Sequence, residues 1–356
     1  MKDNKINRPN YQFSKREELN ELCYQLSLSS DLVQGAGGNI SYKNDGTLWI
    51  KASGCWLSDA LIKDIFLPVN LKHLRESIEN NQFDVNPKIF RETNLRPSIE
   101  TLFHALMPQK YVLHLHPIIP LSLLVRKDSE KFIQERLSKH LTWKMIDYRK
   151  PGGPLAKEIY SKIRYDNKID ILFLKNHGII LGGNSINELS DKLKIILSDL
   201  NDSAFSSNFS DNPITVDKSI SVSKDISIFP IKKRSSIHQL VFEEEMFERI
   251  SDNWALYPDH VVFLGAEPHC FDSIDNLLEK FRNKLFEDIP ELLFIKKKGI
   301  YSKNKISKAK LVQLKCYYDV LKRQENSIEL SCLSKDEIYD ILNWDAEHYR
   351  QNIAKE

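Results

Sequence analysis

The hydrophobic and polar positions of the first 205 residues form a succession of helical and strand-like patterns. Apolar residues recur at helical spacing from about Lys15 to Leu28. Residues 39–43 (NISYK) and 47–51 (TLWIK) alternate like strands on either side of Asn44-Asp45-Gly46, a hairpin-turn sequence. Further helices are predicted over 96–108, with Pro97 near the first turn, and over 128–141, 154–164 and 184–205. Further strands are predicted over 111–116 and on both sides of the turn at 176–178.

A change of composition separates this part from the rest of the chain. Residues 206–229 are rich in Ser, Asn and Asp and show little periodicity, which predicts a linker. The pattern then restarts, with strands predicted at 261–265 and within 291–302, and helices at 273–287, 307–324 and 334–351. We therefore expect a first domain over 1–205, a linker over 206–229, and a smaller C-terminal α/β domain over 230–356, to which the sequence assigns no role.

Composition excludes several classes of partner. The 356 residues carry a net charge of only +2, with 41% hydrophobic and 28% charged residues, as in ordinary globular proteins. This balance predicts neither a nucleic-acid nor a membrane surface, and no apolar run reaches the roughly 18 residues of a membrane span. The polar N-terminus lacks the apolar core of a signal peptide. The five cysteines are scattered without a C-x-x-C pair, so we expect a cytoplasmic protein without disulfides.

Two histidines stand one residue apart in the apolar run VLHLHP (112–117). Residues i and i+2 of a strand point to one face, so His114 and His116 project side by side. Such a pair is a start for a metal site, which wants a third protein ligand. His177, at the turn of LKNHGII, is the third candidate. The alternative is a strand edge or a pair of hydrogen-bonded core histidines.

Two further motifs offer polar groups. Gly35, Gly37 and Gly38 precede a strand rather than a helix, and Ile40 stands where a dinucleotide fingerprint needs glycine, which excludes a Rossmann interpretation. The loop is then either an anion-binding backbone or a plain tight turn. Glu100 and His104 share one helix face at i, i+4 spacing. That pair could serve acid/base chemistry, or form a hydrogen bond on the helix surface.

Five segments, in this order, resemble the class II aldolase/adducin family of zinc-dependent sugar-phosphate aldolases. They are GAGGNISYK (35–43), IKASG (50–54), PSIETLFH (97–104), HLHP (114–117) and KNHGIILGG (175–183). The resemblance covers about residues 15–205. It implies an α/β/α fold around a mostly antiparallel sheet, and usually a fourfold homotetramer with sites at subunit boundaries.

The resemblance also implies a role for each residue that matches a family motif. The implied zinc ligands are His114, His116 and His177, the acidic residue beside the metal is Glu100, and the substrate-phosphate residues are Asn39, Ser53, Gly54 and Ser98. Zn²⁺ or a similar divalent ion would stabilise the enediolate left when a ketose 1-phosphate loses its C3–C4 bond. Glu100 would shuttle protons. Lys51, on the same strand face as Ser53, could add positive charge. One departure is Ser98-Ile99, where simpler family members have two adjacent serines.

The resemblance leaves other activities open. Family members also dehydrate, epimerise or decarboxylate related sugar phosphates, and adducins keep the fold as a non-catalytic module without the metal site. The intact set of three histidines argues against the adducin alternative. The later segments around 257–265 and 291–351 resemble the region that follows the aldolase core in long bifunctional rhamnulose-1-phosphate aldolase/alcohol dehydrogenases. Because the sequence ends before a dehydrogenase half, we expect no oxidoreductase activity.

Overall fold

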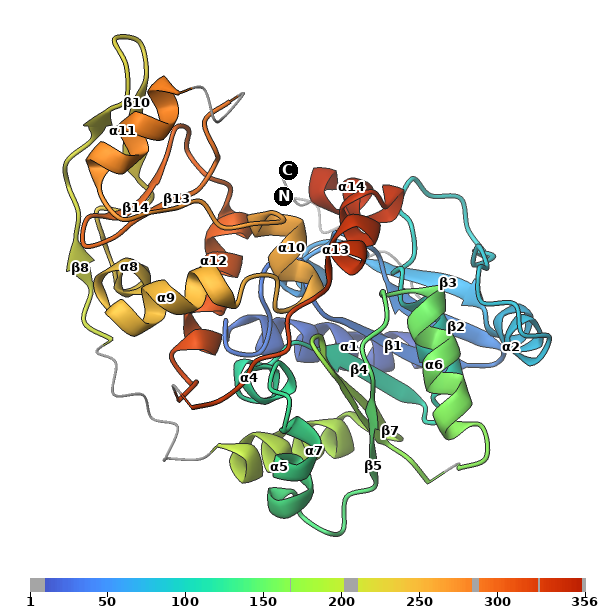
Figure 1. Ribbon diagram of the computed structural model, residues 1–356. Helices are drawn as coiled ribbons and strands as arrows, with labels where there is room; N and C mark the ends of the chain where they lie inside the picture. Colours follow the sequence, from blue (N-terminus) through green and yellow to red (C-terminus); the bar gives the residue numbers. More distant parts are fainter. Residues whose placement is uncertain (1–9, 167, 202–210, 284–287, 326, 354–356) are drawn as a thin grey trace.

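The computed structural model describes residues 10–166, 168–201, 211–283, 288–325 and 327–353. Figure 1 shows two regions, each built around a sheet, with the C-terminal helices lying back over the first region. The ends of the predicted helices 184–205 and 273–287 and the start of the predicted linker lie outside the described residues. None of the helices in the described part of the chain is long and apolar enough to cross a membrane.

A seven-stranded sheet forms the first region, in the order β3-β2-β1-β4-β7-β6-β5. Its strands are β1 (Asn39–Asn44), β2 (Thr47–Lys51), β3 (Phe66–Asn70), β4 (Tyr111–Leu115), β5 (Trp143–Ile146), β6 (Ile171–Leu174) and β7 (Gly178–Gly183). Neighbouring strands run antiparallel except β5 and β6, which are parallel. The predicted hairpin joins β1 to β2, with Asp45 and Gly46 both at positive φ, as its tight turn requires.

Helices cover both faces of this sheet. They are α1 (Asn10–Ser27), α2 (Leu71–Glu79), α3 (Thr101–Leu106), α4 (Ile118–Leu124), α5 (Ser129–Arg136), α6 (Gly153–Ile163) and α7 (Ile186–Leu200), with a 3-10 turn, η1, at Leu57–Leu61. Leu113 packs with α1, α5 and α7 in one core, whereas Val112 packs with α3 and α6 in another. Alternation along β4 therefore separates the two cores. The predicted α/β/α fold with a mostly antiparallel sheet is confirmed.

A five-stranded sheet, in the order β12-β13-β14-β10-β9, forms the second region, beside the strand pair β11-β8. Its elements are β8 (Ile214–Thr215), β9 (Ile220–Ser221), β10 (Ser227–Pro230), β11 (Arg234–Ser235), η3 (Ser236–His238), α8 (Gln239–Phe242), α9 (Glu244–Asp252), α10 (Pro258–Leu264), β12 (Cys270–Phe271), α11 (Ile274–Arg282), β13 (Leu293–Ile295), β14 (Gly299–Ser302), α12 (Lys308–Leu321), α13 (Lys335–Leu342) and α14 (Asp345–Ile353). Apolar side chains of α4, including Leu121, pack with α10 and α12 in one core, so the two regions share buried surface.

The structure differs from the sequence-based expectations at four places. Residues 96–100 are not helical, because Ala52 pairs with Pro97 and Ser53 N–H donates to Arg96 O at 2.9 Å, and α3 begins only at Thr101. Residues 261–264 belong to α10 rather than to a strand, since Pro258 occupies its first turn. The predicted helix 334–351 is two helices, α13 and α14. The described part of the predicted linker contains the short strands β8, β9 and β10.

Candidate metal centre

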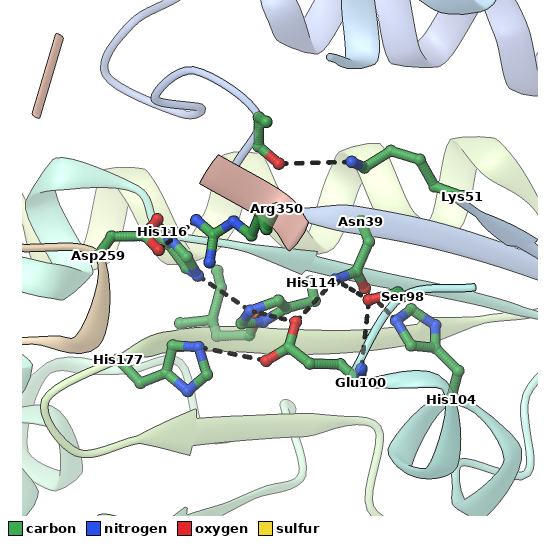
Figure 2. A network of polar contacts seen from close by, with 12 residues as sticks. Asn39, Lys51, Ser98, Glu100, His104, His114, His116, His177, Asp259 and Arg350 are labelled. Carbon is green, nitrogen blue, oxygen red and sulfur yellow. Dashed lines mark hydrogen bonds and ion pairs between the residues drawn. The ribbon is translucent and has the colours of Figure 1, made fainter. Parts of the chain in front are cut away.

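Three buried histidines meet at one end of the first sheet. His114 lies on β4, His116 follows it directly, and His177 lies in the turn between β6 and β7. Their ligand atoms all lie within 4.8 Å of one another, and the Nε2 atoms of His114 and His116 are 3.0 Å apart. Figure 2 shows the three rings converging. This arrangement could hold a metal ion.

The surroundings favour imidazoles that can bind a cation. His114 Nδ1 donates to Ile179 O at 2.9 Å, which leaves the lone pair of a neutral ring on Nε2, facing the other rings. Burial, together with the neighbouring histidines, holds the pKa of His114 well below its usual value. Burial also lowers the pKa of His177 strongly. Both rings are therefore neutral near pH 7, as metal ligation requires.

Glu100 lies beside this cluster, at the N-terminal end of α3. Its Oε2 lies 3.3 Å from His114 Nε2, and its Oε1 lies 3.3 Å from His177 Nε2. Burial raises the pKa of Glu100 to about 7, although the nearby His116 and the amide of Asn39 oppose the rise. A carboxyl group with such a pKa can both donate and accept a proton near neutral pH.

A chain of hydrogen bonds fixes the position of Asn39. Asn39 Nδ2 donates to Glu100 Oε2 at 2.7 Å and to Ser98 Oγ at 3.2 Å. His104 contacts Asn39 Oδ1 through Nε2, and its Nδ1 lies 2.8 Å from Ser41 Oγ. His104 is fully buried, so the sequence-based alternative of a bond on the helix surface is wrong. His104 therefore contacts Asn39, which in turn donates to the Glu100 carboxylate.

One small cavity of about 30 Å³ joins the predicted residues. Its lining includes all four predicted phosphate residues, Asn39, Ser53, Gly54 and Ser98, together with Glu100, His116 and His177. Lys51 also lines the cavity, but its ammonium group donates to Cys55 O at 2.5 Å and lies 3.4 Å from Ala36 O. Lys51 therefore stabilises the glycine loop, residues 35–38, through this contact with Ala36 O.

Sequence reasoning missed three charged residues that line the same cavity: Asp259, Glu347 and Arg350. Asp259 is the second residue of α10, and the other two lie on α14. Arg350 contacts Asp259 Oδ1 and lies 3.2 Å from Glu347 Oε1. Burial disfavours the charged form of Asp259, but Arg350 and His116 hold its pKa well below the usual value. A charged residue inside the apolar run YPDHVVFLG (257–265) was the available signal for Asp259.

Comparison with known proteins assigns a family to the first region of the chain. The family model described as the class II aldolase and adducin N-terminal domain matches residues 17–196, half of the chain. This match confirms the predicted resemblance. It contains all eight predicted site residues, whereas Asp259, Glu347 and Arg350 lie beyond it.

One curated relative is similar to the same part of the chain. A protein of Bacillus subtilis (strain 168) named uncharacterized oxidoreductase YuxG is 26% identical over 182 residues, which cover 46% of this chain. The match covers 26% of that protein, so the chain spans about a quarter of the length of this relative.

Three solved structures illustrate the similarity of fold. The N-terminal class II aldolase domain of a conserved protein from Thermoplasma acidophilum is 23% identical, with a TM-score of 0.45, covering 56% of this chain and 98% of that one. A sugar-phosphate aldolase from Thermotoga maritima is 16% identical, with a TM-score of 0.40 and coverages of 54% and 94%. YgbL from Escherichia coli, a putative aldolase/epimerase/decarboxylase, is 17% identical, with a TM-score of 0.39 and coverages of 52% and 86%.

Proposed function

Because the chain belongs to the class II aldolase/adducin family, we propose that it is a metal-dependent lyase that cleaves or forms a carbon–carbon bond in a ketose 1-phosphate. The metal ligands in this proposal are His114, His116 and His177. The observation that carries it is the convergence of three buried imidazoles beside a buried carboxylate. Three protein ligands with one open position are typical of catalytic zinc, so Zn²⁺ is the proposed ion.

The chemistry divides between the ion and the side chains. A bound divalent ion supplies Lewis-acid stabilisation of the negative charge that develops on an enediolate. In the cleavage direction the substrate C4 hydroxyl would give its proton to solvent water, the C3–C4 bond would break to release an aldehyde, and the electron pair of that bond would pass to the enediolate fragment. Glu100, with its pKa near 7, gives a proton to C3 of that fragment and takes one from C3 in the synthetic direction.

The substrate phosphate is placed by neutral donors in this proposal. Asn39, Ser53, Gly54 and Ser98 come from three separate segments but line one cavity with the metal cluster. Their amide, hydroxyl and backbone N–H groups suit an anion without adding charge. Asn39 already bonds to both Ser98 and Glu100, so the phosphate pocket and the proton-transfer group share one side chain.

Related activities of the family are outcomes of the same test. Dehydration, epimerisation or decarboxylation of a sugar phosphate would give other products from the same cavity. A non-catalytic, adducin-like module would have no need for three converging imidazoles. A homotetramer, proposed on family grounds alone, is tested by light scattering coupled to gel filtration.

The test is metal analysis of the purified protein together with retro-aldol assays on rhamnulose, fuculose and ribulose 1-phosphates. We expect one divalent ion per chain and an aldehyde product from at least one substrate. His177→Ala should lose the metal, whereas His73→Ala, on α2 and outside the cluster, should keep it. Stoichiometric metal in His177→Ala would exclude this ligand set, and a dehydrated or epimerised product would replace the lyase with that activity.

A further inference from the structure

A buried carboxylate from outside the family domain touches the metal centre. Asp259, the second residue of α10, lies with Oδ2 3.3 Å from His116 Nδ1 (Figure 2). Gln313 Nε2 donates to the same oxygen at 3.3 Å, and Arg350 contacts the other oxygen. We propose that Asp259 is a positioning residue of the metal centre, which fixes the tautomer and orientation of His116, and that Arg350 holds Asp259 in place. This inference rests on the metal centre of the proposed function.

The direction of the His116 ring supports this role. Its Nε2 faces His114 Nε2, while its Nδ1 faces Asp259. An imidazole that donates from Nδ1 to a carboxylate keeps its lone pair on Nε2, where the ion would bind, and gains basicity as a ligand. His114 has the equivalent arrangement with a backbone acceptor, Ile179 O. One ligand is thus oriented by the sheet itself, and the other by a residue far along the chain.

The glycine loop leaves room for this contact. A Cβ atom added at Gly37 would lie 2.9 Å from Gln34 O, 3.2 Å from Asp259 Oδ2 and 3.5 Å from His116 Nδ1. The first two distances are tighter than ordinary van der Waals contacts, so a side chain there would push on both the turn at Gln34 and the Asp259–His116 pair. Gly37 therefore serves the tight turn and also the close approach of Asp259 to His116.

Asp259 is held between partners from different elements. Its Oδ1 contacts Arg350 of α14, which leaves Oδ2 to face His116 Nδ1. Its position in the first turn of α10 adds a favourable interaction with the helix dipole. The competing interpretation is purely structural: the Asp259–Arg350 pair would only join α10 to α14. Under that interpretation its loss changes stability and leaves metal affinity unchanged.

The test compares Asp259→Asn with Asp128→Asn, in which the removed carboxylate pairs with Arg126 and lies outside the cavity lining. We expect Asp259→Asn to weaken Zn²⁺ binding about 10–100-fold in competition with a chelator, and Asp128→Asn to leave it unchanged. Folded Asp259→Asn with wild-type Zn²⁺ affinity would overturn the inference. A wild-type protein that bound no metal would overturn the proposed function as well, so the two failures are distinguishable.

A second measurement can decide the question on the wild-type protein alone. In metal-free wild-type protein labelled with ¹⁵N-histidine, the ring nitrogens of His116 report its tautomer by NMR. We expect the proton on Nδ1, and in Asp259→Asn a shift toward a mixture of tautomers. A proton on Nε2 of His116 in the wild-type protein would contradict the proposed role, even if Asp259→Asn failed to fold.

Discussion

Asn39 donates a 2.7 Å hydrogen bond from its amide to Glu100 Oε2, and so ties the first strand of the sheet to the proposed proton-transfer group. The bond stabilises the ionised carboxylate and lowers the pKa that burial raises. Asn39 thereby tunes Glu100 while its neighbour Ser98 faces the same cavity.

Glu100→Gln keeps the size of the side chain but removes the titrating proton. We expect turnover to fall about 10²-fold or more with metal still bound, as on loss of a general acid/base. Steady-state kinetics on the metal-loaded variant checks this. Glu76→Gln, on the exposed face of α2, is the control and should retain full turnover. Near-wild-type turnover in Glu100→Gln would remove Glu100 from the mechanism.

Glu100 also makes the stability of the metal-free protein depend on pH. The pKa of Glu100 in the folded protein is about 7, above the usual value of 4.5. The folded state therefore holds a proton that the unfolded chain releases, so the free energy of unfolding falls as pH rises from about 4.5 to 7 and is then level. The full effect is on the order of 3 kcal/mol for a shift of this size.

Urea titrations of wild type and Glu100→Gln at pH 5 and pH 8 measure this effect, since the variant lacks the titration. We expect the variant to gain stability relative to wild type at pH 8 compared with pH 5. An unfolding free-energy difference between the two proteins that is the same at both pH values would show that the Glu100 carboxyl group is not perturbed.

Asn39→Ala should separate phosphate binding from proton transfer. Loss of its amide removes a proposed phosphate donor, so KM should rise far more for a phosphorylated ketose than for the free ketose. Loss of its bond to Glu100 should raise the pKa of that carboxyl group, which gives a proton during cleavage, and so shift the alkaline limb of the pH–rate profile for cleavage upward. Asn44→Ala, at the end of the same strand, leaves the Asn39 amide and its bond to Glu100 intact and serves as the control. Equal KM changes for the two substrates would exclude Asn39 from the phosphate pocket.

Local signals predicted much of the first region because those signals act over a few residues. The turn Asn44-Asp45-Gly46 accommodates positive φ, and Ser185, near the start of the predicted helix, caps α7 by accepting from Glu188 N–H at 3.1 Å. The i, i+2 rule for strands predicted that His114 and His116 lie on one face, and in the structure both lie close to His177.

Tertiary contacts account for what the sequence did not predict. The helix expected from residue 96 begins late because Pro97 pairs with Ala52, a partner that periodicity cannot reveal. The run at 261–264 is apolar on all sides, so its pattern fits a buried strand or a buried helix equally well. Asp259 meets His116, and Arg350 meets Asp259, only through the packing of α10 and α14 over the first region, and no sequence motif indicates that packing.

The helix α14 should be the part of the site that opens. The cavity of about 30 Å³ has room for roughly one water, whereas small-molecule pockets enclose about 300–1,000 Å³, so a ketose phosphate needs space that α14 now occupies. Ile353 lies so close that a Cβ atom at Gly54 would be 2.7 Å from it. Among the described side chains of α14, Glu347 is buried, whereas none of the apolar side chains is fully buried. The ion pairs that Arg350 forms with Asp259 and Glu347 therefore contribute much of the binding of α14 to the rest of the protein.

Hydrogen exchange followed by mass spectrometry tests this opening. Amides of α14 should exchange faster than those of α12, whose buried face is apolar and includes Leu314 and Leu321, because little apolar burial means a low free energy of local opening. Arg350→Gln removes the contact with Asp259 and should accelerate exchange in α14 about 10-fold, the effect of losing about 1.4 kcal/mol of local stability. His348→Gln, on the exposed side of the same helix, is the matched control and should leave the rate unchanged. Exchange in α14 as slow as in α12, and unaffected by Arg350→Gln, would mean that substrate reaches the cavity by another route.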